Sequence, residues 1–400
     1  MTLPDEDTAT KLLGIAINVR EPKFKDFLDK NGIVLPHSRE RAVLLSMWYQ
    51  SPGGGGESGY FRNRKGTITN MVRALQEGNR AEAWYEIRYG SNGDQAPGIA
   101  KRRFAESEIF GLYEDANDVE AEEAKQVYRM LQAHRVKMLQ YEGRYAAQIA
   151  KANTEYDLSG PEGVDTLVVA LDPAKSALVA VLNEQHPSLN LDADSYLSTN
   201  IYVDPGVDAG QSFTEFDPNH TAHLNAREYD AEGQEKAVNN ILIGEGGEDI
   251  LDGGQGDDIL LGGAGFDTYL YRPGDSNDTI VDADGQGIVF HDAGGSEGLK
   301  TAAVVGLRNA DGNGTYTSPD GRFTFTWSGV SGEVLVITLS GGGQIRVEDF
   351  HPGDFHIQLL DLPTEPPFHL PVIELDEQEE PVAGAPFRGR PDGTADAESL

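Results

Sequence analysis

The chain has 400 residues, no cysteine and a formal net charge of -34 at pH 7. The lack of cysteine excludes disulfides and cysteine-ligated metals. The strong negative charge argues against nucleic acid or an anionic membrane as a partner, because like charges repel. No apolar run approaches the length of a membrane span. A chain of this length is expected to form about two to four domains.

Residues 1–114 are predicted to form a small α-domain, because their apolar residues recur at helical spacing. Ser38 is placed to cap a helix that runs to Tyr49. A loop with four glycines at 53–56 follows. Three further helices are expected at 67–77, 80–89 and 98–110.

Three segments of this region carry a family resemblance. They are RERAVLLSMWYQ before the glycine-rich loop, then MVRALQEGNRAEAWYEIRY, then GIAKRRFAE. Their order is similar to the C-terminal lobe of phage-type lysozymes and pesticin-like muramidases, which hydrolyse the glycan strands of peptidoglycan. The lead-in at 7–27 also resembles that family. The resemblance implies a lysozyme-like fold for residues 1–114.

The same resemblance implies that no catalytic residue lies in this chain. The family's catalytic glutamate belongs to an N-terminal lobe that would precede Asp7, so either the true start is upstream or the region is a non-catalytic remnant or binding module. A glycosidase needs two carboxyl groups beside the scissile bond. Glu21 and Glu40, like Glu6, are expected on solvated helix faces. For Arg102 and Arg103 we favour helix-surface ion pairs with Glu106 over a role in a cleft.

The middle of the chain is expected to connect the helical region to the glycine-rich second half. Residues 115–156 predict a long amphipathic helix. Within a mixed region at 157–234, we expect a buried strand at 166–170, then a helix that begins at 172–173 and ends at 182, and a strand at 201–203. His220 and His223, with Asp217 and Glu228, could hold a metal, but a histidine spacing of three outside a helix is weak support.

Three nine-residue units follow one another in register from residue 244 to residue 270: GEGGEDILD, GGQGDDILL and GGAGFDTYL. Their glycines allow a tight turn and close backbone approach. The sixth residue is always aspartate, and the eighth is Leu251, Leu260 or Tyr269, which we expect in a narrow core between two sheets. The pattern resembles the calcium-binding β-roll repeat of RTX proteins. A flexible Gly/Asp-rich linker is the alternative, which three in-phase units disfavour.

The repeats predict calcium sites within a roll at residues 235–285. Calcium takes about six to eight oxygen ligands, which carboxylates and bare carbonyls on the turns supply. Successive turns alternate sides, so loops eighteen residues apart should hold one ion. This pairs Asp249 with Asp267, and Asp258 with the half-unit at 240–242, while Asp278 marks an out-of-phase turn. The predicted ligand residues are Asn240, Gly244, Gly246, Asp249, Gly253, Gly254, Gln255, Gly256, Asp258, Gly262, Gly263, Ala264, Gly265, Asp267 and Asp278.

Residues 286–362 are predicted to form a β-rich cap. A solenoid needs a cap because its last coil otherwise exposes unpaired strand edges, and the run at 345–359 resembles the segment that caps RTX rolls. Gly294–Gly298 fits the GxSxG pattern of α/β-hydrolases, but an all-β, glycine-rich setting is not its context. Neither HExxH nor a Walker loop occurs. Strands are expected to begin at 287, 323, 334 and 345.

Residues 363–400 are Pro-rich and acidic, which favours disorder. RTX proteins are similar in carrying an uncleaved C-terminal signal for type I export, and this tail lies where that signal would be. The N-terminus, MTLPDED, is acidic where a Sec signal is basic and then apolar. The resemblance therefore implies secretion to the extracellular space by the type I export machinery.

The sequence as a whole predicts a multidomain α and β protein with a lysozyme-like α-domain, a short calcium-binding parallel β-roll and a β-rich cap. Its expected partners are calcium ions, the type I export machinery and peptidoglycan glycan strands. The favoured function is a secreted calcium-binding RTX protein that folds on calcium after export and carries a hydrolase-related domain. The alternative is a non-catalytic, calcium-dependent extracellular binding or structural protein.

Overall fold

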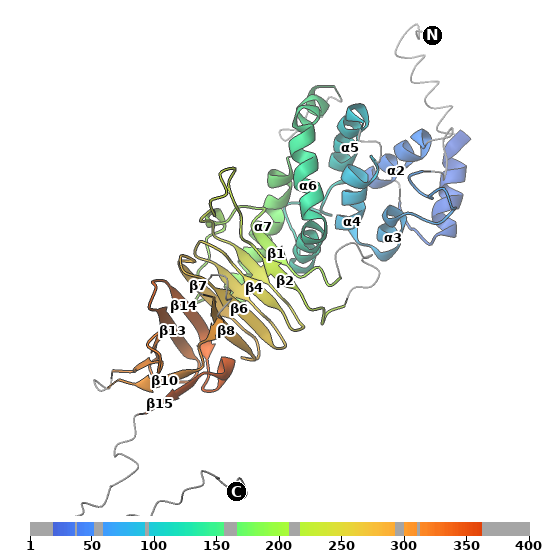
Figure 1. Ribbon diagram of the computed structural model, residues 1–400. Helices are drawn as coiled ribbons and strands as arrows, with labels where there is room; N and C mark the ends of the chain where they lie inside the picture. Colours follow the sequence, from blue (N-terminus) through green and yellow to red (C-terminus); the bar gives the residue numbers. More distant parts are fainter. Residues whose placement is uncertain are drawn as a thin grey trace, which may run out of the picture. The chain divides into compact units, whose positions relative to one another are not determined.

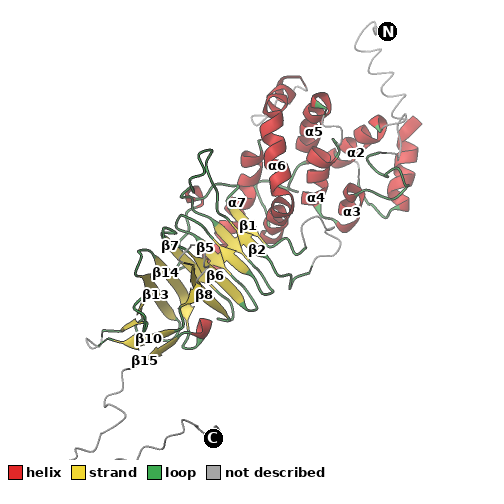
Figure 2. Ribbon diagram, in the orientation of Figure 1, coloured by secondary structure: helices red, strands yellow, loops and turns green. Residues whose placement is uncertain are grey.

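The computed structural model describes residues 19–36, 38–51, 59–92, 96–155, 166–207, 217–292, 300–309 and 313–361, all within one compact unit. Helices occupy the first half of the described chain and strands the second half (Figures 1 and 2). The predicted glycine-rich loop at 53–56, the GxSxG stretch at 294–298 and the acidic tail lie outside the described residues.

The helices of the N-terminal half lie where the apolar spacing predicts them. Ser38 caps the first labelled helix by accepting the N–H of Arg41 at 3.3 Å, and residues 19–30 form a helix before it. The others are α2 (Arg39–Gln50), α3 (Asn70–Glu77), α4 (Arg80–Tyr85), a π-helix (Glu86–Gly90), α5 (Pro97–Phe110), α6 (Ala121–Glu155) and α7 (Leu167–Gln185).

Aromatic and charged side chains fill the interior of this helical region. The rings of Phe24, Phe27 and Phe61 surround Trp48 with centroids 5.2 to 5.4 Å from it. The predicted ion pairs of Glu106 with Arg102 and Arg103 are confirmed. Arg103 is only 1% exposed, however, so that pair lies inside the region and not on its surface.

Helix α7 shows that the strand predicted at 166–170 is wrong. One helix runs from Leu167 to Gln185 with Pro173 inside it. Proline normally breaks a helix because it lacks an N–H and clashes with an earlier carbonyl. Here the hydroxyl of Tyr113 donates to the carbonyl of Ala170 at 2.7 Å and accepts the N–H of Ala174 at 3.3 Å. A side chain from another element thus satisfies the backbone where the helix passes the proline.

The strands form two sheets whose parallel part is the predicted roll. One sheet has the order β1-β3-β5-β7-β14-β13-β12-β11-β10-β15, and the other β2-β4-β6-β8-β9. The strands of the parallel coils are β1 (Ile201–Val203), β2 (His223–Asn225), β3 (Ile241–Ile243), β4 (Ile250–Asp252), β5 (Ile259–Leu261), β6 (Asp267–Tyr271), β7 (Asn277–Val281) and β8 (Gly287–Asp292).

The register of the roll follows the repeat. Ile241 pairs with Ile259, an offset of eighteen residues, and Ile259 pairs with Thr279, an offset of twenty. The longer second offset is the out-of-phase turn that the sequence predicts near Asp278. The eighth-position residues Leu251, Leu260 and Tyr269 are at most 2% exposed and pack together between the sheets, as expected.

The outer face of one sheet is also apolar, and the helices cover it. Ile243, Leu261 and Val281 belong to the same buried cluster as Leu178 and Leu182 of α7. This explains why strands of the first sheet read as continuous apolar runs such as ILI and ILL, since strands buried on both faces do not alternate. The helical region therefore packs against the outer face of the first sheet of the roll.

The cap closes the roll through a strand from far along the chain. Strand β14 (Gln344–Phe350) pairs in parallel with β7, and β13 (Glu333–Leu339) pairs antiparallel with β14. The parallel stack extends past residue 285, because β8 pairs with β6. The remaining cap strands are β9 (Lys300–Ala302), β10 (Val305–Arg308), β11 (Thr315–Thr317), β12 (Phe323–Thr326) and β15 (Gln358–Leu360).

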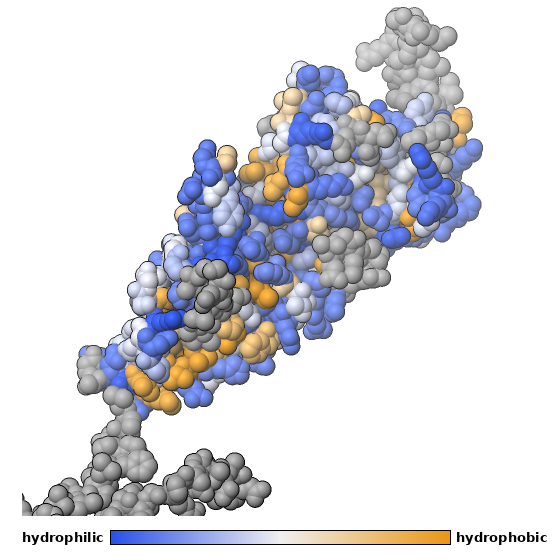
Figure 3. Space-filling view, viewed as in Figure 1, coloured by the Kyte–Doolittle hydropathy of each residue, from blue (hydrophilic) through white to orange (hydrophobic). Residues whose placement is uncertain are grey.

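The surface of the helical region is mostly hydrophilic in the view of Figure 3, whereas apolar side chains gather over the strands near the cap. Within the described residues, no helix combines the length and the apolar character that crossing a membrane requires.

Candidate metal centre

The turns of the roll stack into two columns. Column A consists of loops 244–249 and 262–267, and column B of residues 238–240 with loops 253–258 and 274–278. In column A the N–H of Gly247 donates to the carbonyl of Ala264 at 2.9 Å. In column B the N–H of Val238 donates to the carbonyl of Gln255 at 2.7 Å. Loops eighteen residues apart therefore touch, as the repeat predicts.

The aspartates of both columns share one hydrogen-bonding pattern. Oδ1 of Asp267 accepts the N–H of Asp249 at 2.9 Å, and Oδ1 of Asp258 accepts the N–H of Asn240 at 2.7 Å. Oδ1 of Asp278 accepts the N–H of Asp258 at 3.1 Å. Each carboxylate thus bridges to the loop one coil earlier and holds the two loops in register.

The second carboxylate oxygen has no such partner. Oδ2 of Asp249, Asp258 and Asp267 is buried without a hydrogen-bond partner, and so is the side-chain oxygen of Asn240. These four residues are at most 1% exposed. A buried, unpaired charged oxygen costs several kcal/mol unless a cation or proton neutralises it. The pattern fits a cation held between stacked loops.

The electrostatics of the two columns point the same way. Burial raises the pKa of Asp249 and of Asp258 to about 7, and the charges of nearby aspartates add to the effect. Burial raises the pKa of Asp267 to about 6, helped by the charges of Asp282 and Asp284. Burial also raises the pKa of Asp278 well above its usual range. Carboxylates with raised pKa values in a cluster are groups that a bound cation would return to the ionised form.

The glycines at the first position of each unit make room for these carboxylates. A Cβ on Gly244 would collide with Oδ2 of Asp249, and one on Gly253 would collide with Oδ2 of Asp258. The carbonyl oxygen of Gly262 also lies close to the same point at Gly244, 2.6 Å from where a Cβ would be. Carboxylate and carbonyl oxygens from two loops therefore converge on one place.

The convergence fits calcium better than a soft metal. Calcium accepts backbone carbonyls beside carboxylates, whereas zinc sites are usually built from three or four side chains. In the described parts of the chain, no group of three or more His, Cys, Asp or Glu side chains is arranged to hold a metal ion. The oxygens must therefore come partly from the main chain, as the loops provide.

The predicted ligand residues fall into the two columns. Column A contains Gly244, Gly246, Asp249, Gly262, Gly263, Ala264, Gly265 and Asp267, and column B contains Asn240, Gly253, Gly254, Gln255, Gly256, Asp258 and Asp278. The metal site considered at His220 and His223 is not formed among the described residues. His220 instead pairs with Asp204, Nδ1 to Oδ1 at 2.8 Å, at the end of column A.

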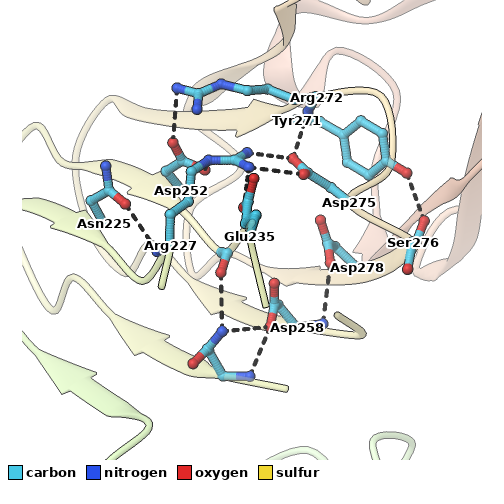
Figure 4. Close-up of polar contacts among 12 residues, drawn as sticks. Asn225, Arg227, Glu235, Asp252, Asp258, Tyr271, Arg272, Asp275, Ser276 and Asp278 are labelled. Atoms are coloured by element: carbon cyan, nitrogen blue, oxygen red, sulfur yellow. Dashed lines mark hydrogen bonds and ion pairs between the residues drawn. The ribbon is translucent and has the colours of Figure 1, made fainter. Parts of the chain in front are cut away.

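Arg227 adds a protein cation to column B (Figure 4). Its side chain is only 3% exposed and forms ion pairs with Glu235 at 2.5 Å, Asp252 at 2.8 Å and Asp275 at 2.6 Å. The contact to Asp252 is ionic without good hydrogen-bond alignment, because both atoms lack a hydrogen-bond partner. Although burial lowers the pKa of Arg227, Asp275 and Asp252 raise it overall. One guanidinium therefore bridges carboxylates from three coils.

Sequence reasoning missed two aspartates that extend column A. Asp284 Oδ2 accepts the N–H of Gly265 at 3.1 Å, and Asp282 Oδ2 accepts the hydroxyl of Tyr269 at 2.6 Å. Their loop reads DADGQG and lacks the glycine pattern of the repeat. The signal that could have found them is the twenty-residue offset between paired strands, which places residue 282 next to Gly262 in the following coil.

Comparison with known families agrees with the geometry. Residues 237–269 match the family described as RTX calcium-binding nonapeptide repeat, with 4 copies. The match begins ahead of the three full units and so includes the half-unit around Asn240. No curated protein matches the chain. The chain therefore carries RTX calcium-binding repeats, and these bind Ca²⁺. Proteins with such repeats are typically secreted.

Proposed function

We propose that the chain is a secreted protein whose roll folds when calcium neutralises its two columns after type I export. The observation that carries this proposal is the set of buried, unpartnered Oδ2 atoms on Asp249, Asp258 and Asp267. Without a cation these carboxylates oppose folding, because they are buried beside one another. The unfolded segment suits passage through an exporter. Proteins with RTX repeats are typically secreted, which supports an extracellular location.

The residues divide the work of folding between them. The Oδ1 atoms of the aspartates hold neighbouring loops in register through backbone N–H groups. The Oδ2 atoms and the loop carbonyls supply the oxygens toward the ion, and bound calcium supplies the positive charge that offsets their repulsion. Because the ion binds only the folded loops, its binding free energy becomes folding free energy.

The test is circular dichroism of the full chain during a calcium titration. Millimolar calcium should increase the β-sheet signal, whereas the same concentration of magnesium should not, because magnesium keeps its waters and prefers stricter geometry. The triple variant D249A/D258A/D267A should lose the response. A wild-type chain with no rise in β signal at millimolar calcium would contradict the proposal.

For the helical region we propose a role at peptidoglycan as a binding module. The resemblance to a lysozyme lobe supports this, and so does a cavity of about 490 Å³. Aromatic rings with amide and charged groups around a concave site suit a sugar ligand. The described residues that line the cavity are Tyr89, Gly90, Asn92, Lys137, Gln140, Tyr141 and Arg144.

The alternative role, hydrolysis, has less support because no catalytic carboxylate is assigned, and Glu21 and Glu40, expected on solvated helix faces, form ion pairs with arginines. Glu40 pairs with Arg80 at 2.8 Å, and Glu21 pairs with Arg41 at 3.3 Å. We expect the chain to sediment with purified peptidoglycan but to give no clearing in a peptidoglycan zymogram. A Gln140→Ala substitution should weaken the sedimentation without unfolding the helices. Clearing of the gel would favour hydrolysis, and no sedimentation would contradict both roles.

A further inference from the structure

Glu245 is the one second-position residue of the three units that is not glycine. Gly254 and Gly263 occupy that position in the other two units. Glu245 adopts a left-handed backbone conformation with φ 70°, which glycine accepts easily and other residues rarely adopt. The repeat would therefore favour glycine here, and the glutamate calls for a reason outside the turn.

The backbone of Glu245 belongs to column A. Its carbonyl accepts the N–H of Ala264 at 2.9 Å, and the next residue, Gly246, forms a parallel bridge with Ala264. On its other side, Gly244 abuts Oδ2 of Asp249. The main chain of Glu245 therefore lies between two stacked loops that we assign to calcium.

The side chain of Glu245 leaves the roll and joins helix α6. Its carboxylate lies 2.5 Å from Nη2 of Arg129 and 2.8 Å from Nζ of Lys125, which are one turn apart on the helix. The side chains of Glu245 and Arg129 are 17% and 12% exposed, so the pair is largely shielded from water. Such shielded, double ion pairs fix geometry more firmly than exposed ones.

Other contacts extend the same interface. Arg135 of α6 donates to the hydroxyl of Tyr202 in β1 at 2.8 Å, and Tyr128 donates to the carbonyl of Ser198 at 3.1 Å. Beside them, the apolar outer face of the sheet packs on α7. The surface on which the helices rest is complete only when the coils of the roll are stacked.

We infer that Glu245 is a positioning residue that transmits calcium loading of column A to helix α6, so that calcium secures the helical region as well as the roll. This inference rests on the proposed function, because it assumes that calcium orders the loops. Ordering loop 244–249 fixes the carboxylate of Glu245 where Arg129 and Lys125 meet it. By reciprocity, docking of α6 must favour the calcium-bound loop by the same factor.

Hydrogen exchange of the full chain, with and without calcium, tests this directly. For the wild type, calcium should increase amide protection both in strands β3 to β7 and in α6 at residues 121–135. In Glu245→Gln and Arg129→Gln the strands should still gain protection, while the gain in α6 should fall about fivefold. Arg129→Gln leaves the loop itself intact, so the same result in both variants points to the contact and not to a damaged turn.

Three controls separate the possible outcomes. Glu248→Gln alters an exposed glutamate of the same loop, and Glu122→Gln alters an exposed partner of Arg129; both should behave as wild type. Glu245→Gly restores the repeat's glycine, so calcium should order the strands at least as readily while α6 loses its gain. If α6 gains no protection in the wild type, or keeps its full gain in Glu245→Gln, the inference is wrong. If the strands gain none, the proposed function fails instead.

Discussion

Buried charges in the helical region are balanced by individual arginines, as Glu40 of α2 shows. Its side chain is 13% exposed and lies 2.8 Å from the guanidinium of Arg80. Partial burial by itself raises the pKa of Glu40, but hydrogen bonds with Arg80 and Ser38 outweigh burial and lower it to about 2. A carboxyl whose folded pKa lies below its unfolded value stabilises the fold above the unfolded pKa, which is about 4.5 for Glu40. That contribution disappears as the pH falls toward 2.

A Glu40→Gln substitution should therefore destabilise the helical region by about 1–2 kcal/mol at pH 7. The difference from wild type should shrink as the pH is lowered from 4.5 to 2, because wild-type Glu40 becomes neutral over that range. Urea unfolding followed by tryptophan fluorescence at several pH values measures it. Asp29→Asn, which breaks an exposed pair with Lys25, serves as the control and should change stability by less than about 0.5 kcal/mol. A difference at pH 2 as large as that at pH 7 would contradict the assignment.

At the scale of elements, helix α7 depends on a hydroxyl supplied by another segment. Tyr113 is 6% exposed, and its hydroxyl joins Ala170 to Ala174 beside Pro173. Tyr113→Phe would leave a carbonyl and an N–H unpaired, so we expect a loss of about 1–3 kcal/mol. Faster hydrogen exchange near residue 174 should accompany it. Tyr49→Phe, at a half-exposed tyrosine, should have little effect on stability, and equal effects of the two substitutions would contradict the role of Tyr113.

In the roll, the buried ion pairs of Arg227 allow a prediction about stability. Arg227→Met should destabilise the roll by about 3–5 kcal/mol, because Glu235, Asp252 and Asp275 would be left as a group of buried negative charges. Arg272→Met should cost less than about 1 kcal/mol, since that side chain is 35% exposed and lies 3.2 Å from Asp252. Thermal unfolding at fixed calcium distinguishes them. Similar losses for the two variants would show that burial of Arg227 is not what matters.

These elements show what the sequence could and could not reveal. The roll was predictable because its information is periodic: unit length sets the pairing of Ile241 with Ile259, and the eighth position sets the core. The helix predicted from 172–173 to 182 lies within α7, but its first turn was predicted as a strand, because Tyr113 lies 57 residues before Ala170 and nothing in the local sequence indicates the contact. Arg227 and Asp282 were also missed, because neither occupies a position that recurs in the nine-residue repeat.

At the scale of the whole molecule, the net charge is -34, and the helical region and the roll balance their carboxylates in different ways. In the helical region, carboxylates such as Glu40, Glu106 and Glu142 meet arginines. In column A, burial and the charges of other aspartates raise the pKa of Asp249 and of Asp267. The helical region can therefore fold with its own cations, whereas column A needs ions from solution.

This difference predicts one thermal transition in a calcium chelator and two with calcium. Without calcium the roll is unfolded, so the helical region alone should melt. When the free calcium concentration is about 100 times the dissociation constant of a site, the ion bound there adds about 2.7 kcal/mol to the stability of the roll. Calcium should therefore raise the roll's transition most, and the helical transition should follow it because α6 and α7 rest on the roll. Calorimetry with a magnesium control at equal ionic strength measures both transitions, and a helical transition that stays fixed while the roll's transition rises would show that the two regions unfold independently.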